Sequence, residues 1–157
     1  MRWSEIGDQR CSVARALSVV GERWTMLVLR EAFMRTRRFD DFQRRTGAPR
    51  PILADRLRQL VANGILERRP YGNHADRFDY RLTEKGLDLY PALVALMQWG
   101  DRWMPVDGGP PVTLEHRHCG HEVHPELACP DCGEWIGARD MNAHARDREE
   151  RAARAAS

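Results

Sequence analysis

The sequence has no long hydrophobic run. None of its apolar stretches approaches the roughly 20 residues that a helix needs to cross a bilayer, and its first ten residues are polar, unlike a signal peptide. Cysteine is scarce, with four in 157 residues. We therefore expect a cytoplasmic protein with no membrane partner, in which the cysteines stay reduced unless they bind metal or sense oxidants.

The chain also has little net charge, but that charge is unevenly spread. The formal net charge is +2, and 42% hydrophobic residues allow a core to form beside 31% charged residues. Residues 1–104 hold nineteen basic and thirteen acidic side chains, whereas residues 105–157 hold six and ten. A basic body with an acidic tail indicates nucleic-acid contacts in the body.

Residues 38–64 have the pattern of two helices joined by a sharp break. Phe39 and Phe42 suit the inward face of a short first helix. The stretch 46–49 interrupts it, because Gly and Pro punctuate helices. Apolar residues then recur at helical spacing until Gly64, which stands where a helix usually ends. They are Ile52, Leu53, Leu57, Leu60 and Val61.

Residues 66–82 have the pattern of a two-stranded ribbon. Residues 66–71 and 78–82 read as strands, and Gly72 and Asn73 open the turn between them. Two helices followed by such a ribbon predict a winged helix-turn-helix, whose second helix enters a DNA major groove. The expected fold class is mainly α with a small β wing.

The same segment is rich in arginine. From residue 35 to residue 81, twelve arginines stand against six acids, and arginine neutralises DNA phosphates. If the leucines of the second helix face the core, Arg50 and Arg58 point outward. The expected DNA-binding residues are Arg50, Ala54, Arg56, Arg58 and, near the wing tip, Arg77. Arg56 could instead tie two helices together, and a solvated charged face is the alternative for the whole set.

Apolar helices flank this segment. Residues 13–20 place an apolar face before Gly21, and residues 22–33 are apolar over much of their circumference, which suits a buried position. Another helix begins at Thr83, a good N-cap, and continues to about residue 104. Its apolar surface exceeds what one small domain needs, so we expect it to pair, together with the first helix, with a second chain. The alternative is a helix that lies back across its own domain.

Two short ligand-like motifs follow a linker rich in Gly and Pro. Each pairs two metal-ligand side chains across two residues, a spacing that lets both reach one ion from a tight turn. Zn²⁺ takes four N or S ligands tetrahedrally in structural sites. The set that closes such a site is His116, Cys119, Cys129 and Cys132. The competing histidines are His118, His121 and His124. Free cysteines among surface histidines are the alternative to a structural zinc.

These patterns predict the following organisation. An N-terminal arm covers residues 1–10, and the winged helix-turn-helix and dimerisation domain covers residues 11–104. A linker over residues 105–113 leads to a zinc-ribbon-like module over residues 114–137. Residues 138–157 form a polar tail, either a solvated helix or disordered. Trp135 and Ile136 are expected to pack under the ribbon.

Four blocks of sequence, in order, resemble the HxlR family of bacterial transcriptional regulators, within the broader MarR-like winged-helix group. They are CSVARALSVVGERWTMLVLREAF (11–33), RRFDDFQRRTG (37–47), LADRLRQLVANGILERRPY (53–71) and FDYRLTEKG (78–86). The resemblance covers about residues 11–103. It implies a homodimer that binds an operator with two-fold symmetry.

The sequence departs from the family pattern near the DNA-reading end. Pro49 stands where Ser or Thr commonly caps the recognition helix, Pro51 where Lys is frequent, and Ala54 where Ser is frequent. Ser12 replaces a frequent Pro. The loss of polar groups near the recognition helix implies a different base preference, while Pro remains acceptable in a first helical turn.

Cys11 matches the N-terminal cysteine of the family, which in some members senses oxidants or electrophiles. A helix N-terminus stabilises a thiolate, so Cys11 is the expected redox- or effector-sensing residue. The alternative is a small residue packed at the dimer interface.

Three classes of function follow from these expectations. The first is a homodimeric repressor that responds to a thiol-reactive or small-molecule signal. The second is an adaptor that binds another protein through the zinc ribbon. The third is a zinc enzyme, which would need an open metal position and a base such as Glu122 or Glu134; four protein ligands leave no position open. The expected protein is therefore a regulator and not an enzyme.

Overall fold

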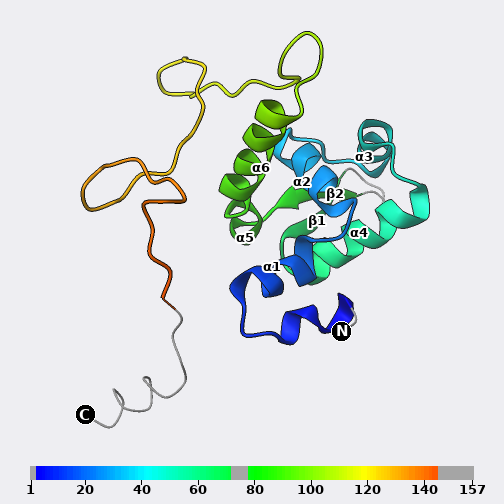
Figure 1. The fold of residues 1–157 in the computed structure, drawn as a ribbon. Helices are drawn as coiled ribbons and strands as arrows, with labels where there is room; N and C mark the ends of the chain where they lie inside the picture. Colours follow the sequence, from blue (N-terminus) through cyan, green and yellow to red (C-terminus); the bar gives the residue numbers. More distant parts are fainter. Residues whose placement is uncertain (1–2, 72–77, 145–157) are drawn as a thin grey trace. The chain divides into compact units, whose positions relative to one another are not determined.

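The computed structural model describes residues 3–71 and 78–144 of the chain, and side chains from residue 5 onward. The chain divides into two units, Met1–Asp107 and Gly108–Ser157. The first unit is mainly helical and carries a small antiparallel sheet (Figure 1). None of the described helices is long and apolar enough to cross a membrane.

The N-terminal segment is more ordered than the loose arm we expected for residues 1–10. It contains a short 3-10 helix, η1 (Trp3–Asp8), which packs beside α1 (Ser12–Val20). Gly7 allows this approach, since a Cβ at that position would lie 3.0 Å from the Ser18 Oγ. The arm therefore forms part of the folded unit.

Helix α2 (Thr25–Phe33) lies at the centre of the first unit and contacts α3, α4, α6 and β2 (Figure 1). It begins three residues later than expected, because residues 22–24 form a turn in which the Thr25 amide donates to the Glu22 carbonyl (2.9 Å). Val28 and Leu29 are fully buried. The sequence pattern of residues 22–33, apolar on most sides of the helix, thus correctly indicates a central, buried helix.

The core joins α2 to the two helices that follow, α3 (Phe39–Thr46) and α4 (Arg50–Ala62). Phe42 on α3 is fully buried and meets the Tyr80 ring edge-on at 6.2 Å. From α4, every third or fourth residue enters the core, as the helical spacing predicted. These residues are Leu53, Leu57 and Leu60.

The wing is formed by β1 (Leu66–Pro70) and β2 (Phe78–Leu82), paired antiparallel from Leu66↔Leu82 to Pro70↔Phe78. The Tyr80 amide also donates to the Arg37 carbonyl (2.8 Å), which holds the segment before α3 against β2. The expected turn residues Gly72 and Asn73 lie outside the described residues, as does Arg77.

The helix expected from Thr83 to about residue 104 is in fact two helices. These are α5 (Glu84–Leu87) and α6 (Tyr90–Trp103). Pro91 lies in the first turn of α6, where its missing amide costs nothing, but it could not continue a helix from α5. Thr83 caps α5 as expected, with its side chain accepting from the Gly86 amide (3.2 Å).

Gly86 allows α5 to lie against the chain leading into β1. A Cβ at this position would lie 2.3 Å from the Ile65 carbonyl oxygen. We expect Gly86→Ala to lower the free energy of unfolding by about 1–3 kcal/mol, because backbone must move to relieve the overlap. Calorimetric melting of the purified full chain would measure the effect.

Gly100→Ala on α6 is the matched control, since the added Cβ there meets no atom within 4 Å apart from its chain neighbours and the nearby backbone of its own helix. A helical Gly→Ala change in open space should be neutral or stabilising. Equal melting temperatures for the two variants would show that the contact at Gly86 does not constrain the fold.

Candidate nucleic-acid interface

The turn between α3 and α4 is fixed by its own hydrogen bonds. Gly47 adopts a left-handed conformation (φ 71°), and its amide donates to the Gln43 carbonyl (2.9 Å). The Thr46 hydroxyl donates to the Phe42 carbonyl (2.7 Å) and accepts from the Ala48 amide (3.2 Å). Through the Thr46 hydroxyl the turn is thereby tied to two core residues, Phe42 and Ala48.

Helix α4 begins at Arg50 after the Pro49 cap, with Pro51 in its first turn. Arg58 lies on the side of the helix away from the buried leucines, and Arg50 is the first residue of the helix; their side chains are 70% and 65% exposed. Ala54 is half-buried between them. Both arginines are therefore exposed, as the sequence predicted.

Arg50 is held at the junction of α3 and α4. Its guanidinium lies 3.2 Å from the Asp40 carboxylate and 3.3 Å from the Gln43 side-chain oxygen. It also lies 4.7 Å from the centre of the Phe39 ring. Such weak exposed pairs orient a side chain while leaving it able to exchange partners.

Arg56 and Arg58 share a carboxylate but have different surroundings. Arg58 donates to Asp55 at 3.0 Å and otherwise faces solvent. The Arg56 side chain is only 19% exposed, and it pairs with Asp55 at 2.7 Å and with Glu22, before α2, at 3.4 Å. Of the two roles considered for Arg56, these contacts support the tie between helices.

The arginines beside the wing stack on aromatic rings, a feature that the sequence reasoning missed. The Arg68 guanidinium lies 3.9 Å from the centre of the Phe78 ring, and that of Arg38 lies 4.4 Å from the Tyr71 ring. Cation–π contacts of this kind hold the guanidinium in place without neutralising it. The alternation of arginines and aromatic residues along 68–80 is the signal that could have indicated them.

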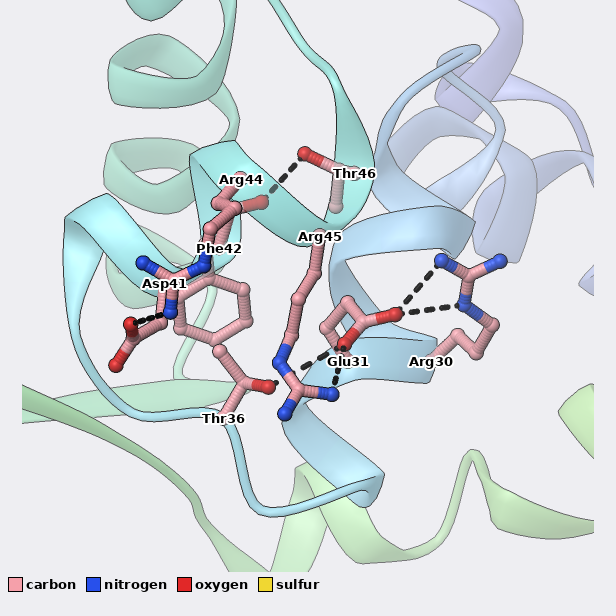
Figure 2. Close-up of polar contacts among 8 residues, drawn as sticks. All are labelled: Arg30, Glu31, Thr36, Asp41, Phe42, Arg44, Arg45 and Thr46. Atoms are coloured by element: carbon pink, nitrogen blue, oxygen red, sulfur yellow. Dashed lines mark hydrogen bonds and ion pairs between the residues drawn. The ribbon is translucent and has the colours of Figure 1, made fainter.

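A buried carboxylate connects α2 to α3 and was also missed (Figure 2). Glu31 is 3% exposed. It accepts hydrogen bonds from Arg30 (2.7 and 3.0 Å) and Thr36 (3.3 Å), and Arg45 approaches it at 3.8 Å. A buried acid requires such partners. In the sequence, a single acid within an apolar helix, followed by several arginines, is the pattern that could have indicated this contact.

Cys11 occupies the N-cap position of α1 and is exposed. Its backbone is extended, and its carbonyl accepts the first helical hydrogen bond, from the Arg15 amide (3.0 Å). The thiol thus stands at a helix N-terminus, as the sequence predicted.

Two helices of the first unit leave apolar side chains in solvent. On α1, Val13 is 66% exposed and only Ala14 is buried. On α6, Leu96, Trp99 and Trp103 are 53%, 55% and 62% exposed. Apolar helical surface of this extent usually has a partner.

In the second unit, both ligand-like motifs form tight turns. The amides of Cys119 and Gly120 donate to the His116 carbonyl (3.2 and 2.7 Å), and the His116 ring lies 3.2 Å from the Cys119 sulfur. Short antiparallel bridges flank the turns, Glu115↔Glu122 and Ala128↔Trp135. Each turn therefore presents its two donor side chains together.

The second turn also favours the thiolate. Backbone hydrogen bonds from Cys132 and Asp131, and then one from the Cys132 side chain, lower the pKa of Cys129 below its ordinary value. Gly133 supports the turn in a left-handed conformation (φ 74°), with its amide donating to the Cys129 carbonyl (2.9 Å). A turn that aims amides at sulfur suits a metal-binding thiolate.

The two turns are not brought together. Within the described part of the chain, no group of three or more His, Cys, Asp or Glu side chains converges on one point. Each donor pair supplies half of the ligands of a zinc site, and the complete set of four ligands stays a prediction. Trp135 is 66% exposed, so the expectation that it packs under a ribbon is wrong; Ile136 is half-buried.

Known proteins share both the sequence and the fold of the chain. A family model described as HxlR-like helix-turn-helix matches residues 19–107. The HTH-type transcriptional regulator Rv3095 of Mycobacterium tuberculosis, itself uncharacterised, is 53% identical over 130 residues, which are 83% of this chain and 82% of that protein. Since the first unit ends at Asp107, a match of this length extends into the second unit.

Solved structures agree with the sequence match. The crystal structure of PA1607, a candidate transcription factor, is 36% identical, with a TM-score of 0.78 over 93% of this chain and all of that one. The reduced form of the redox regulator HypR is 29% identical, with a TM-score of 0.54 over 59% of this chain and 92% of that one.

These matches agree with the helix–turn–helix geometry, the wing and the exposed arginines of α4. The winged fold predicted from the sequence is confirmed for the mainly helical first unit and its two-stranded sheet. The chain is a DNA-binding transcriptional regulator, not an enzyme, and belongs to the HxlR family.

Proposed function

We propose that the protein is a homodimeric repressor that binds a two-fold symmetric operator through α4 and the wing. The observation that carries this proposal is the orientation of α4. A row of buried leucines fixes the helix, so its outward side carries Arg58, and Arg50 is exposed at its first residue. In a winged helix-turn-helix that side enters the major groove.

Within this proposal the predicted residues take different roles. Arg50 and Arg58 contact guanine edges or phosphates, since a guanidinium fits the paired acceptors of guanine. Ala54, lying between them, allows the groove floor to approach the helix. Arg56 positions α4 through Glu22 instead of binding DNA itself. Arg77, which lies outside the described residues, keeps its predicted role as a contact to the backbone or minor groove.

The dimer is supported by the apolar faces of α1 and α6. A second copy of the chain is the proposed occupant, since a two-fold symmetric assembly covers the same faces on both chains. Two recognition helices would then meet two half-sites one helical turn apart.

DNA binding can be measured by fluorescence anisotropy with the chain's own upstream DNA across a salt series. We expect tight binding that weakens steeply with salt, with two chains per duplex at saturation. Arg50→Ala and Arg58→Ala should each weaken binding about tenfold. Binding that does not depend on salt, or does not exceed that to random DNA, would favour the adaptor function instead.

Two control variants separate DNA contact from folding. Arg139→Gln in the second unit removes an exposed arginine elsewhere and should leave the affinity unchanged. Arg56→Gln should lower the melting temperature, because it removes a largely buried tie, whereas Arg58→Ala should not. An Arg58→Ala variant with unchanged affinity would contradict the proposed role of α4.

We also propose that the second unit holds a structural zinc ion through His116, Cys119, Cys129 and Cys132. The two donor pairs on tight turns support this set. Bound metal would supply the cross-link that a short polar segment lacks, because metal binding contributes directly to folding free energy.

Elemental analysis of the purified full chain should find about one zinc ion per chain. Cys129→Ser and His116→Ala should lose it, because each removes a ligand. His118→Ala is the matched control, since His118 is a neighbouring exposed histidine and should leave the zinc content unchanged. Loss of zinc in His118→Ala but not in His116→Ala would show that the histidine ligand is misassigned.

For Cys11 we propose a sensing role, supported by its exposure at the N-terminus of α1 and by the likeness to a redox regulator. A quinone, to which a single thiol adds with formation of a C–S bond, should weaken DNA binding of the wild-type protein but not of Cys11→Ser. Zinc content must be followed in parallel, because zinc-bound thiolates can oxidise and release metal. Equal responses of the two proteins would remove Cys11 from the mechanism.

A further inference from the structure

A hollow of about 410 Å³ lies among the segment before α3, α3 itself and β2. Its volume falls within the range of about 300–1,000 Å³ that is typical of small-ligand sites. The side chains around it are unusually basic for a site of this size. Its five arginines are Arg35, Arg37, Arg38, Arg44 and Arg45. Asp41 and Asp79 are the lining acids.

The acids around the hollow already have partners. Asp41 pairs with Arg44 on α3 (Figure 2), and Asp79 pairs with Arg81 at 3.6 Å. Arg45 points toward the buried Glu31 (Figure 2). In the part of the chain that the structure describes, the remaining three arginines of the hollow have no carboxylate partner. They are Arg35, Arg37 and Arg38.

The segment that carries these three arginines is held in place at both ends. The Arg35 amide donates to the Ala32 carbonyl (3.0 Å), and the Arg37 carbonyl accepts from the Tyr80 amide (2.8 Å). Between them Thr36 is buried and bonded to Glu31 (Figure 2). Arg35 itself adopts a left-handed conformation (φ 63°), which is costly for a side chain of this size. The surroundings therefore hold an arginine where the backbone disfavours one.

The charge of the hollow indicates what it would bind. Three unpaired guanidinium groups repel one another unless an anion lies between them. The planar donor fork of arginine matches the oxygens of phosphate. An anion with two or more negative charges balances this excess better than a single carboxylate does.

We propose that the hollow is a phosphate-binding site, with Arg35, Arg37 and Arg38 as its ligands. The phosphate groups come from one of two sources, a free phosphorylated small molecule or the DNA backbone. The second source rests on the proposed DNA-binding function, and the first does not. Among the described residues, none of α4 lines the hollow, so the site is separate from the predicted base-reading helix.

The first arm of the test uses the full chain without DNA. Isothermal titration with pyrophosphate, in a chloride buffer free of other phosphate, would compare the wild type with Arg35→Gln/Arg37→Gln. Binding to the double variant should be at least about tenfold weaker, since two charge-assisted contacts are lost. Asp79→Asn should bind more tightly, because it removes a negative charge from the hollow. Arg139→Gln is the control for charge alone.

The second arm uses DNA anisotropy across the same salt series. If the phosphates are those of DNA, the double variant should bind more weakly, and its salt dependence should correspond to one or two fewer phosphate contacts. Circular dichroism and melting curves would verify that the double variant is folded. Neither substituted side chain has a hydrogen bond or ion pair in the described structure, so stability should not fall.

The possible outcomes distinguish the two sources of phosphate from each other and from a hollow that binds no phosphate. Pyrophosphate binding that the double variant loses supports the free-ligand source, and a DNA-only effect supports the backbone source. If the folded double variant matches the wild type in both arms, the proposal is overturned. A wild type that binds pyrophosphate but no DNA would support the hollow while contradicting the proposed function.

Discussion

The row of leucines buried along α4 is the constraint on which the proposed DNA-reading surface depends. Leu53, Leu57 and Leu60 can enter the core only at one rotation of the helix. Burying them contributes about 1.5–3 kcal/mol each, far more than an exposed ion pair of Arg50 or Arg58. The outward direction of Arg58 is therefore a consequence of core packing, and it does not depend on which partner Arg58 finds in solution. Arg50 is the first residue of α4, and its contacts with Asp40 and Gln43 of α3 orient it.

The α3–α4 pair needs a second anchor, because a helix pair alone is free to shift on the rest of the domain. Glu31 supplies it from α2. Its carboxylate joins Arg30 on its own helix to Thr36 and Arg45, so the start and end of the α3 region share one buried acid (Figure 2). Because a buried carboxylate that loses its partners is costly, this contact resists displacement of α3 and of the arginine-rich segment before it.

Sequence reasoning predicted the elements whose signals are local. Helical spacing located α4, and the glycine at position 47 located the turn before it. It failed where contacts between residues far apart in the sequence determine the structure. A periodic apolar pattern cannot show that the helix expected from Thr83 to about residue 104 stops and restarts near Pro91, and composition cannot show that Trp135 stays exposed. Likewise, Arg56 and Arg58 are equivalent in sequence, and only their surroundings distinguish a buried tie from an exposed contact.

If α4 meets DNA as proposed, the acids beside its exposed arginines modify how this surface binds. In the free protein Arg50 pairs with Asp40, and Arg58 pairs with Asp55. Each exposed pair contributes at most about 1 kcal/mol, so a phosphate or guanine can displace the carboxylate at little cost. The displaced acid then lies near the DNA and repels phosphates that are poorly aligned. Such pairing lowers the affinity for any DNA, but it lowers most the affinity for DNA on which the arginines are misaligned. It therefore favours discrimination between sites over tight non-specific binding.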